Sequence, residues 1–252
     1  MIDIHCHILH GMDDGPREID TSVSLCEMAM ENGIEKIIAT PHLTRLHEID
    51  EFIEMRDERL DELRGEIKRR GMILEIYGGA EVYIGEEVFY SGTLNKATLN
   101  KSRYLLVEFD FSGIRFSSVA QYIDQIIDMD LVPVVAHPER YSFLQENYER
   151  ADILLDKGAL FQINSGSLAS RGSLEEFELA YEMTMKNAAS FIGTDAHSLR
   201  NRPNDLLKML RFFPPDISQR GLNQMLNISP ERIIRNEQIL TQERRPLRKH
   251  RR

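Results

Sequence analysis

The stretch IDIHCHILHGMDDGP, residues 2–16, starts as a short apolar strand and continues into histidines and carboxylates. Side chains two positions apart on a strand point to the same side. His5 and His7 can therefore bind one metal ion while Cys6 faces the opposite way. This stretch predicts a strand that carries two metal ligands at its end.

The turn after this strand supplies a carboxylate. Gly15 and Pro16 favour a tight loop, which could bring Asp14 back over the end of the strand. Asp13 is the less favoured of the two neighbouring aspartates, although the sequence alone separates them poorly. We expect Asp14, with Asp13 as the alternative, to join the two histidines.

Six more apolar runs are typical of strands, and helix-period segments lie between most of them. The seven predicted strands are 2–4, 36–39, 73–77, 104–109, 132–136, 160–163 and 190–193. The predicted helices are 21–32, 49–70, 117–129 and 173–187, followed by a purely helical region with segments 204–212, 218–226 and 230–236. Strands that alternate with helices, without a long linker, predict one α/β domain of parallel strands over residues 1–240.

A candidate ligand stands at the carboxyl end of most of these strands. The histidines and carboxylates in these places are His5, His7, His42, Glu81, Glu108, His137, Asp195 and His197. The carboxyl ends of parallel strands lie on one face, where α/β barrels keep their active sites. Residues far apart in the chain are therefore expected to converge on one cleft.

The complete set argues for metal binding better than any single residue, because a lone strand-end histidine is more often structural. An unpaired carboxylate such as Glu108 in an apolar strand is costly to bury, and a metal ion would compensate its charge. With Asp14 the set offers five histidines and four carboxylates, whereas one such ion takes about four to six donors. Two or three ions of Mn, Fe or Zn are expected. His10, His47 and His250 lack this placement and are assigned to the surface or to local hydrogen bonds.

Arginines close to these motifs indicate an anionic substrate. Arg140 stands three residues after His137, and Arg200 and Arg202 follow the DAH motif. A guanidinium can hold phosphate oxygens by forked hydrogen bonds. Three divalent ions, four carboxylates and a bridging hydroxide would leave a charge of about +1. This balance favours phosphoester hydrolysis, with Arg140 and either Arg200 or Arg202 on the phosphate.

Composition and other motifs exclude several classes of protein. The 252 residues are 42% hydrophobic and 29% charged, which is ordinary globular composition. No apolar run approaches the roughly 20 residues that span a bilayer, and the N-terminus does not read as a signal peptide. Two cysteines cannot form a disulfide framework, so we expect a cytoplasmic protein. Neither cysteine is followed by arginine six residues later, and GxxxxGK[ST], GxGxxG and GxSxG are absent.

The charge of the chain is unevenly distributed. Residues 244–252 carry six of the 31 lysines and arginines, and without residues 241–252 the net charge of −10 becomes −15. An acidic body argues against nucleic acid as a partner. We expect residues 241–252 to form a mobile basic tail, which either only solubilises the protein or makes weak contact with an anionic membrane.

Seven stretches, taken in order, resemble the bacterial PHP-domain (polymerase and histidinol phosphatase superfamily) tyrosine phosphatases of capsular and exopolysaccharide synthesis. They are IDIHCHILHGMDDGP, IIATPHLTR, GGAEVYI, YLLVEFDF, PVVAHPERY, QINSGSLA and IGTDAHS. HxH and DxH alone would mark only the wider PHP superfamily, whereas MDDGP, HPER and SGSLA are far more specific to the tyrosine-phosphatase branch. The resemblance covers about residues 1–240.

This resemblance implies a distorted seven-stranded (β/α) barrel with extra C-terminal helices and a three-metal, usually manganese-dependent, site. The implied metal ligands are His5, His7, Asp14, His42, Glu81, Glu108, His137, Asp195 and His197, with Arg140 and either Arg200 or Arg202 on the phosphate. The usual partner in this family is a membrane-associated tyrosine kinase that phosphorylates itself. The resemblance therefore implies action at the inner face of the plasma membrane.

We therefore expect a metal-dependent protein-tyrosine phosphatase that forms no covalent phosphoenzyme, in which a metal or His197 assists the leaving phenolate. One alternative is a small-molecule phosphatase of histidinol-phosphate type or a PHP exonuclease, with the same metals and a different pocket. The other is a non-catalytic kinase-binding module whose metals only stabilise the fold. The complete ligand set argues against the latter.

Overall fold

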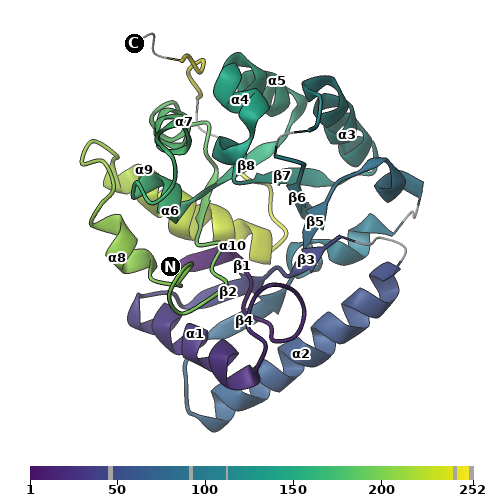
Figure 1. The fold of residues 1–252 in the computed structure, drawn as a ribbon, viewed down its shortest axis with the longest axis vertical. Helices are drawn as coiled ribbons and strands as arrows, with labels where there is room; N and C mark the ends of the chain where they lie inside the picture. The colour runs from purple at the N-terminus through teal and green to yellow at the C-terminus, as the bar shows by residue number, and fades with distance from the viewer. Residues whose placement is uncertain (45–47, 91–92, 112, 241–242, 250–252) are drawn as a thin grey trace.

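The computed structural model describes residues 1–44, 48–90, 93–111, 113–240 and 243–249 (Figure 1). Strands occupy the middle of the molecule, and helices surround them. Within the described residues, no helix combines the length and the apolar character needed to cross a membrane.

Six parallel strands form the larger sheet, in the order β3, β5, β6, β7, β8, β9. Each neighbouring pair is parallel, so the carboxyl ends of these strands lie at one edge, as the sequence predicted. The strands are β3 (His42–Leu43), β5 (Glu81–Tyr83), β6 (Tyr104–Glu108), β7 (Val132–Ala136), β8 (Leu160–Asn164) and β9 (Phe191–Gly193).

Three further parallel strands form the smaller sheet: β1 (Ile2–Cys6), β2 (Lys36–Ala39) and β4 (Glu75–Gly78). The chain leaves this sheet after β2 and β4 and continues into β3 and β5 of the larger one. Pro41, which has no N–H to donate, stands at the first break, and Gly79 stands at the second. Across the breaks, Gly79 N donates to Ala39 O at 2.8 Å and Glu81 N donates to Pro41 O at 3.1 Å.

The two sheets meet where β1 lies beside the end of β9. Asp195 N donates to His5 O at 2.9 Å, and His7 N donates to Ala196 O at 2.8 Å. The predicted α/β class with parallel strands is confirmed. The predicted seven-stranded barrel is not confirmed, because the interruptions at Pro41 and Gly79 divide the strands of the described residues between two hydrogen-bonded sheets.

Helices connect the strands and cover their outer side (Figure 1). The helices before β9 are α1 (Ile19–Glu31), α2 (Ile49–Arg69), α3 (Phe116–Asp128), α4 (Ser142–Glu146), α5 (Glu149–Lys157), α6 (Ser165–Leu168) and α7 (Leu174–Met185). Short 3₁₀ turns are η2 (Glu86–Tyr90), η3 (Leu94–Ala97), η4 (Leu99–Lys101) and η5 (Pro138–Arg140). After β9 come α8 (Leu206–Leu210), α9 (Gln219–Asn223), the π-helical turn η6 (Gln224–Ile228) and α10 (Ser229–Ile234).

Alternate residues of the strands face two different hydrophobic clusters. On β6, Leu105 and Val107 belong to the cluster shared with the surrounding helices. Tyr104 and Leu106 belong to an inner cluster, which consists mainly of strand residues such as Val134. Successive side chains of a strand point to opposite faces, so a strand that is buried on both sides contributes to two clusters. The core therefore fixes the direction in which each strand-end side chain points.

The described part of the predicted tail, residues 243–249, lies against α5 and α7. Arg244 forms ion pairs with Asp152 and Asp156 of α5. Leu247 is fully buried, and its N–H donates to Asp152 Oδ2 at 2.9 Å. The acidic face of α5 and an apolar site for one leucine account for this packing. The rest of the predicted tail lies outside the described residues.

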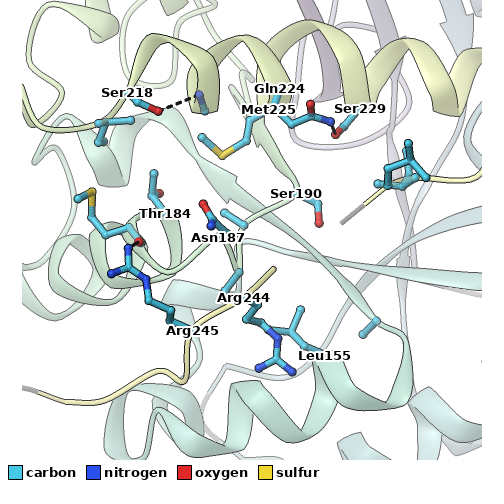
Figure 2. Close-up of a pocket in the computed structure, with 18 of the residues that line it drawn as sticks. Leu155, Thr184, Asn187, Ser190, Ser218, Gln224, Met225, Ser229, Arg244 and Arg245 are labelled. Atoms are coloured by element: carbon cyan, nitrogen blue, oxygen red, sulfur yellow. Dashed lines mark hydrogen bonds between the residues drawn. The ribbon is translucent and has the colours of Figure 1, made fainter. Parts of the chain in front are cut away.

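A cavity of about 470 Å³ lies beside this segment, at the amino ends of β8 and β9 (Figure 2). Ser190, directly before β9, lines it together with Arg244 and Arg245. Its walls mix hydroxyl and amide groups with apolar side chains such as Met225. The cavity is separate from the candidate site, which lies at the opposite, carboxyl ends of the strands.

Candidate metal centre

His5 and His7 stand at the end of β1, and both are fully buried. Their Nε2 atoms are 3.2 Å apart. The other nitrogens are held by neighbours, since His5 Nδ1 is 2.6 Å from Gln162 Oε1 and His7 Nδ1 is 2.7 Å from Asp13 Oδ2. A histidine that donates from Nδ1 keeps Nε2 free to bind a metal ion. β1 therefore presents two oriented nitrogen donors.

The carboxylate of Glu81, on β5, lies at the centre of the cluster. Its Oε2 is 3.1 Å from His5 Nε2 and 3.2 Å from His7 Nε2. The same oxygen is 3.1 Å from His42 Nδ1, and Oε1 is 2.9 Å from His137 Nε2. Burial alone would raise the pKa of Glu81, but the surrounding histidines hold it well below its usual value. An ionised carboxylate thus faces four imidazoles.

β9 leads into Asp195 and His197, which repeat the arrangement two residues apart. Asp195 Oδ1 is 3.6 Å from Nε2 of both His5 and His7. His197 Nε2 is 3.1 Å from Asp14 Oδ1, and the rings of His197 and His7 are stacked with centroids 3.7 Å apart. Burial and the neighbouring His7 lower the pKa of His197 to about 3. This imidazole is therefore neutral at pH 7.

β6 and β7 contribute Glu108 and His137. Glu108 Oε1 is 3.5 Å from His137 Nε2, and its Oε2 is 3.8 Å from His42 Nδ1. Burial, followed by repulsion from Glu81, raises the pKa of Glu108 to about 7. A nearby cation would offset this repulsion and stabilise the ionised form of Glu108.

The backbone at the site is strained at two of these residues. His137 has φ of 32° and Asp195 has φ of 53°, in the left-handed region that side chains with a Cβ rarely adopt. Such conformations cost on the order of 1–3 kcal/mol and persist where surrounding structure imposes them, commonly at functional sites. At Gly193 a Cβ atom would lie 2.8 Å from Gln162 Nε2 and 3.0 Å from the Cβ of His5. Glycine is needed for this close approach.

The structure brings all nine predicted metal ligands together. His137 and Asp195 join the cluster through the contacts described above. The other seven fall into three groups in which one atom from each residue lies within 4.8 Å of the rest: His7, Asp14, His42 and His197; His5, His7 and Glu81; and His42, Glu81 and Glu108. Their role as ligands remains a prediction.

The donor atoms fit a divalent cation. Glu81 Oε2 and His197 Nε2 are buried, and their close contacts with neighbouring ring nitrogens or the Asp14 carboxylate do not have the geometry of a hydrogen bond. A buried polar atom left without a partner costs free energy, and a cation would satisfy both atoms. The thiol of Cys6 belongs to none of the three groups; it donates to Ala196 O at 3.9 Å and accepts a hydrogen bond from Asn204 Nδ2 at 3.3 Å. Nitrogen and oxygen donors without thiolate suit the first-row metals predicted from the sequence.

Two of the predicted arginines lie at the rim of the cluster. Arg140 Nη1 is 3.8 Å from Asp195 Oδ2. Arg202 Nη1 is 3.3 Å from the same oxygen, and Arg202 Nη2 is 3.1 Å from Asp14 Oδ2. Arg140 and Arg202 line one cavity, whereas Arg200 is exposed and does not line it. The geometry therefore favours Arg202 over Arg200 as the second arginine.

Three residues that orient the ligands were not assigned this role from the sequence. Asp13 and Gln162 hold the first two histidines, as described above. Asn164 Nδ2 donates to Asp195 Oδ2 at 2.9 Å. Gln162 and Asn164 stand two residues apart at the carboxyl end of β8, and this spacing was the available signal.

Of the three histidines that the sequence placed outside the site, the structure describes only His10. His10 Nε2 is 2.9 Å from Glu62 Oε2, which is a local contact away from the cluster. His47 and His250 lie outside the described residues.

Comparisons with known proteins match nearly the whole chain. A model of the family described as capsular polysaccharide synthesis, CpsB/CapC, matches residues 1–235. The putative tyrosine-protein phosphatase CapC of Staphylococcus aureus is 35% identical over 96% of both chains. The tyrosine-protein phosphatase YwqE of Bacillus subtilis is 32% identical over 99% of this chain and 97% of its own.

A solved structure gives the same result. It comes from work on YwqE of Bacillus subtilis and CpsB of Streptococcus pneumoniae, described there as unique metal-dependent tyrosine phosphatases. It matches with a TM-score of 0.83 and 30% identity, over 99% of this chain and 100% of its own. The chain belongs to the CpsB/CapC family of capsular polysaccharide synthesis.

Proposed function

We propose that this chain is a metal-dependent protein-tyrosine phosphatase, which hydrolyses phosphotyrosine in proteins. The observation that carries the proposal is the buried cluster around Glu81, with Arg140 and Arg202 at its rim. The activity named for the full-length relatives supports it. In capsular or exopolysaccharide synthesis the substrate would be a tyrosine kinase that phosphorylates itself.

Two or three divalent ions are the cofactor in this proposal, with manganese as the first choice and iron or zinc as alternatives. Such ions would supply the positive charge that activates water and neutralises phosphoryl oxygens. The residues that would hold them are His5, His7, Asp14, His42, Glu81, Glu108, His137, Asp195 and His197. With neutral histidines this set carries four negative charges, so it favours cations.

Arg140 and Arg202 would bind the phosphoryl group. The guanidinium of Arg140 lies 4.5 Å from the centre of the Phe111 ring, and this stacking restricts its rotation. Arg202 is held by its contacts with Asp14 and Asp195. Each planar fork can donate two hydrogen bonds to phosphoryl oxygens. These bonds strengthen as negative charge develops in the transition state, which is how they would lower the barrier.

His197 would act as a metal ligand more than as a proton donor. Its pKa of about 3 makes the ring neutral, and its Nδ1 is 2.8 Å from the backbone oxygen of Asp195. This contact directs Nε2 toward Asp14. A tyrosine phenolate has a conjugate pKa of about 10 and leaves with little help from a proton donor. The same site is therefore expected to hydrolyse phosphotyrosine faster than phosphoserine.

The exposure of the cluster suits a protein substrate. The side chain of Asp14 is 62% exposed, whereas Glu81 on the inner side is fully buried. A phosphotyrosine side chain on a protein surface can reach metals at such an open edge. The proposed partner is a membrane-associated bacterial tyrosine kinase. The basic tail would add little to membrane contact, because Arg244 is already paired with α5.

A substrate panel tests this proposal against its alternatives. The metal-loaded protein is given a phosphotyrosine peptide, the same peptide with phosphoserine, histidinol phosphate and single-stranded DNA. We expect the highest kcat/KM for the phosphotyrosine peptide. A preference for histidinol phosphate or DNA would indicate one of the related metal-dependent enzymes. Kinase binding without turnover of any substrate would indicate a non-catalytic module.

A further inference from the structure

A cavity of about 230 Å³ opens beside the metal centre. It shares Asp195 with the cluster and extends to Arg171, between α6 and α7, and to Asn201 and Pro203 after β9. One water molecule takes up about 30 Å³ of the liquid. The cavity therefore has room for a chemical group in addition to the phosphoryl group at the metals.

The walls of this cavity are positively charged. Arg140, Arg171 and Arg202 line it, against the carboxylates of Asp195 and Glu176. The lining side chains thus carry three positive charges against two negative charges. The sign of this balance is opposite to that of the whole chain, which has a net charge of −10. Such a local field attracts anionic groups.

Of the three arginines that line the cavity, Arg171 is the one to which the proposed function assigns no role. Its backbone N–H donates to Gly166 O at 2.9 Å, and the preceding Ser170 has a left-handed φ of 58°. Its Nη2 is 3.4 Å from Oδ2 of the buried Asp205. The side chain is still 45% exposed. A guanidinium has five N–H groups, so the contact with Asp205 can position it while other donors remain for a ligand.

We propose that this cavity binds the carboxylate of an acidic residue that flanks the phosphotyrosine of the substrate, with Arg171 as the main contact. This inference rests on the proposed phosphatase function. Arg140 and Arg202 lie against Asp195 and would hold the phosphoryl group, so Arg171 meets a second anionic group of the same peptide. A guanidinium and a carboxylate pair through two parallel hydrogen bonds. Ser165 and Ser167 add hydroxyl groups to the wall.

The test compares pairs of phosphotyrosine peptides. The two peptides of a pair differ only in having Glu or Gln at one of the two positions before, or one of the two positions after, the tyrosine. We expect kcat/KM for the best Glu peptide to exceed that of its Gln counterpart by about three- to tenfold, decreasing as salt rises. In Arg171→Gln this ratio should fall to about one. In Arg171→Glu it should fall below one, and in Arg171→Lys part of it should remain.

Arg211→Gln is the matched control, because Arg211 is exposed beyond the end of α8 and does not line the cavity. It should keep the wild-type ratio. Metal content and thermal unfolding show whether each variant is folded. If one variant does not fold, the Glu-to-Gln ratio of kcat/KM in the wild-type protein still tests the proposal. Equal kcat/KM for all Glu and Gln pairs in the wild type would overturn it, and so would an unchanged ratio in folded Arg171→Gln. Failure to hydrolyse any phosphotyrosine peptide would instead contradict the proposed function.

Discussion

Asp13 Oδ2 lies 2.7 Å from His7 Nδ1, on the side of the ring opposite to the Glu81 carboxylate. The same aspartate accepts hydrogen bonds from the backbone N–H groups of Gly15, at 2.9 Å, and His42, at 3.0 Å. Burial would raise the pKa of Asp13, but the bond with His7 and these two N–H groups hold it below its usual value. Asp13 is thus a fixed anion that orients His7.

Replacing Asp13 by Asn should weaken metal binding while leaving all nine proposed ligands in place. An asparagine keeps the shape but loses the charge that orients the imidazole, and such changes typically cost 10- to 100-fold in metal affinity. Metal titration of the chelated protein measures this affinity. Asp14→Asn removes a proposed ligand and should lower the number of bound ions as well. An Asp13→Asn variant with wild-type affinity would show that Asp13 does not orient His7.

Arg140→Ala should lower turnover of a phosphotyrosine peptide on the order of 10²-fold, because it removes a contact that strengthens in the transition state. The metal content should not change, since Arg140 is no ligand. Lysine at this position should restore only part of the activity, because a point charge replaces a planar fork. Steady-state kinetics and elemental analysis provide the readouts. Unchanged kcat/KM in the alanine variant would mean that Arg140 is structural.

Glu139 should make the stability of the protein depend on pH. Burial raises the pKa of this fully buried carboxyl to about 7, although it accepts a hydrogen bond from Asn164 N at 2.8 Å. In the unfolded chain its pKa is about 4.3, so between these values the folded state binds more protons. The contribution of Glu139 to stability is therefore present below about pH 4.3 and is lost as pH rises to 7.

The Glu139→Gln variant cannot ionise and should lack this loss. From pH 5 to pH 8, the free energy of unfolding of the variant should increase relative to that of the wild type by an amount on the order of 2 kcal/mol. Urea unfolding of both proteins at matched metal saturation measures the difference. Parallel curves for the two proteins across this range would show that Glu139 ionises normally.

Leu247→Ala should destabilise the protein by about 2 kcal/mol, because Leu247 is fully buried. Leu240→Ala is the control, since Leu240 is 60% exposed and its truncation should have little effect. Hydrolysis of a short phosphopeptide should be the same in both variants, because the segment lies away from the metal centre. Equal stability of the two variants would mean that residues 243–249 do not pack against the body in solution.

The order of strands and long helices follows from the sequence, because each has a clear hydrophobic period. The four long helices begin and end within two residues of the prediction. The short strands β3 and β5 were missed, because two or three residues after Pro41 and Gly79 have no measurable period. The packing of Leu247 was missed for another reason. It depends on Asp152, which is 95 residues away in the chain.

The candidate ligands were predictable because strand ends meet on one face and few other side chains bind metals. Their orientation was not. Gln162 and Asn164 are neutral amides, which sequence patterns do not separate from ordinary polar residues at a strand end. The choice of Arg202 over Arg200 likewise depends on the path of the loop after His197, which brings the Arg202 guanidinium to Asp14.

Metal content and phosphotyrosine-peptide hydrolysis, measured on the same sample before chelation, after chelation and after Mn, Fe, Zn or Mg is restored, test the central claim most directly. We predict that activity disappears with the metal and returns with Mn as two or three ions bind per chain. His7→Ala and Asp195→Ala should bind fewer ions and stay inactive. Full hydrolysis by the metal-free protein, or no more than one ion per chain with metal in excess, would contradict the account.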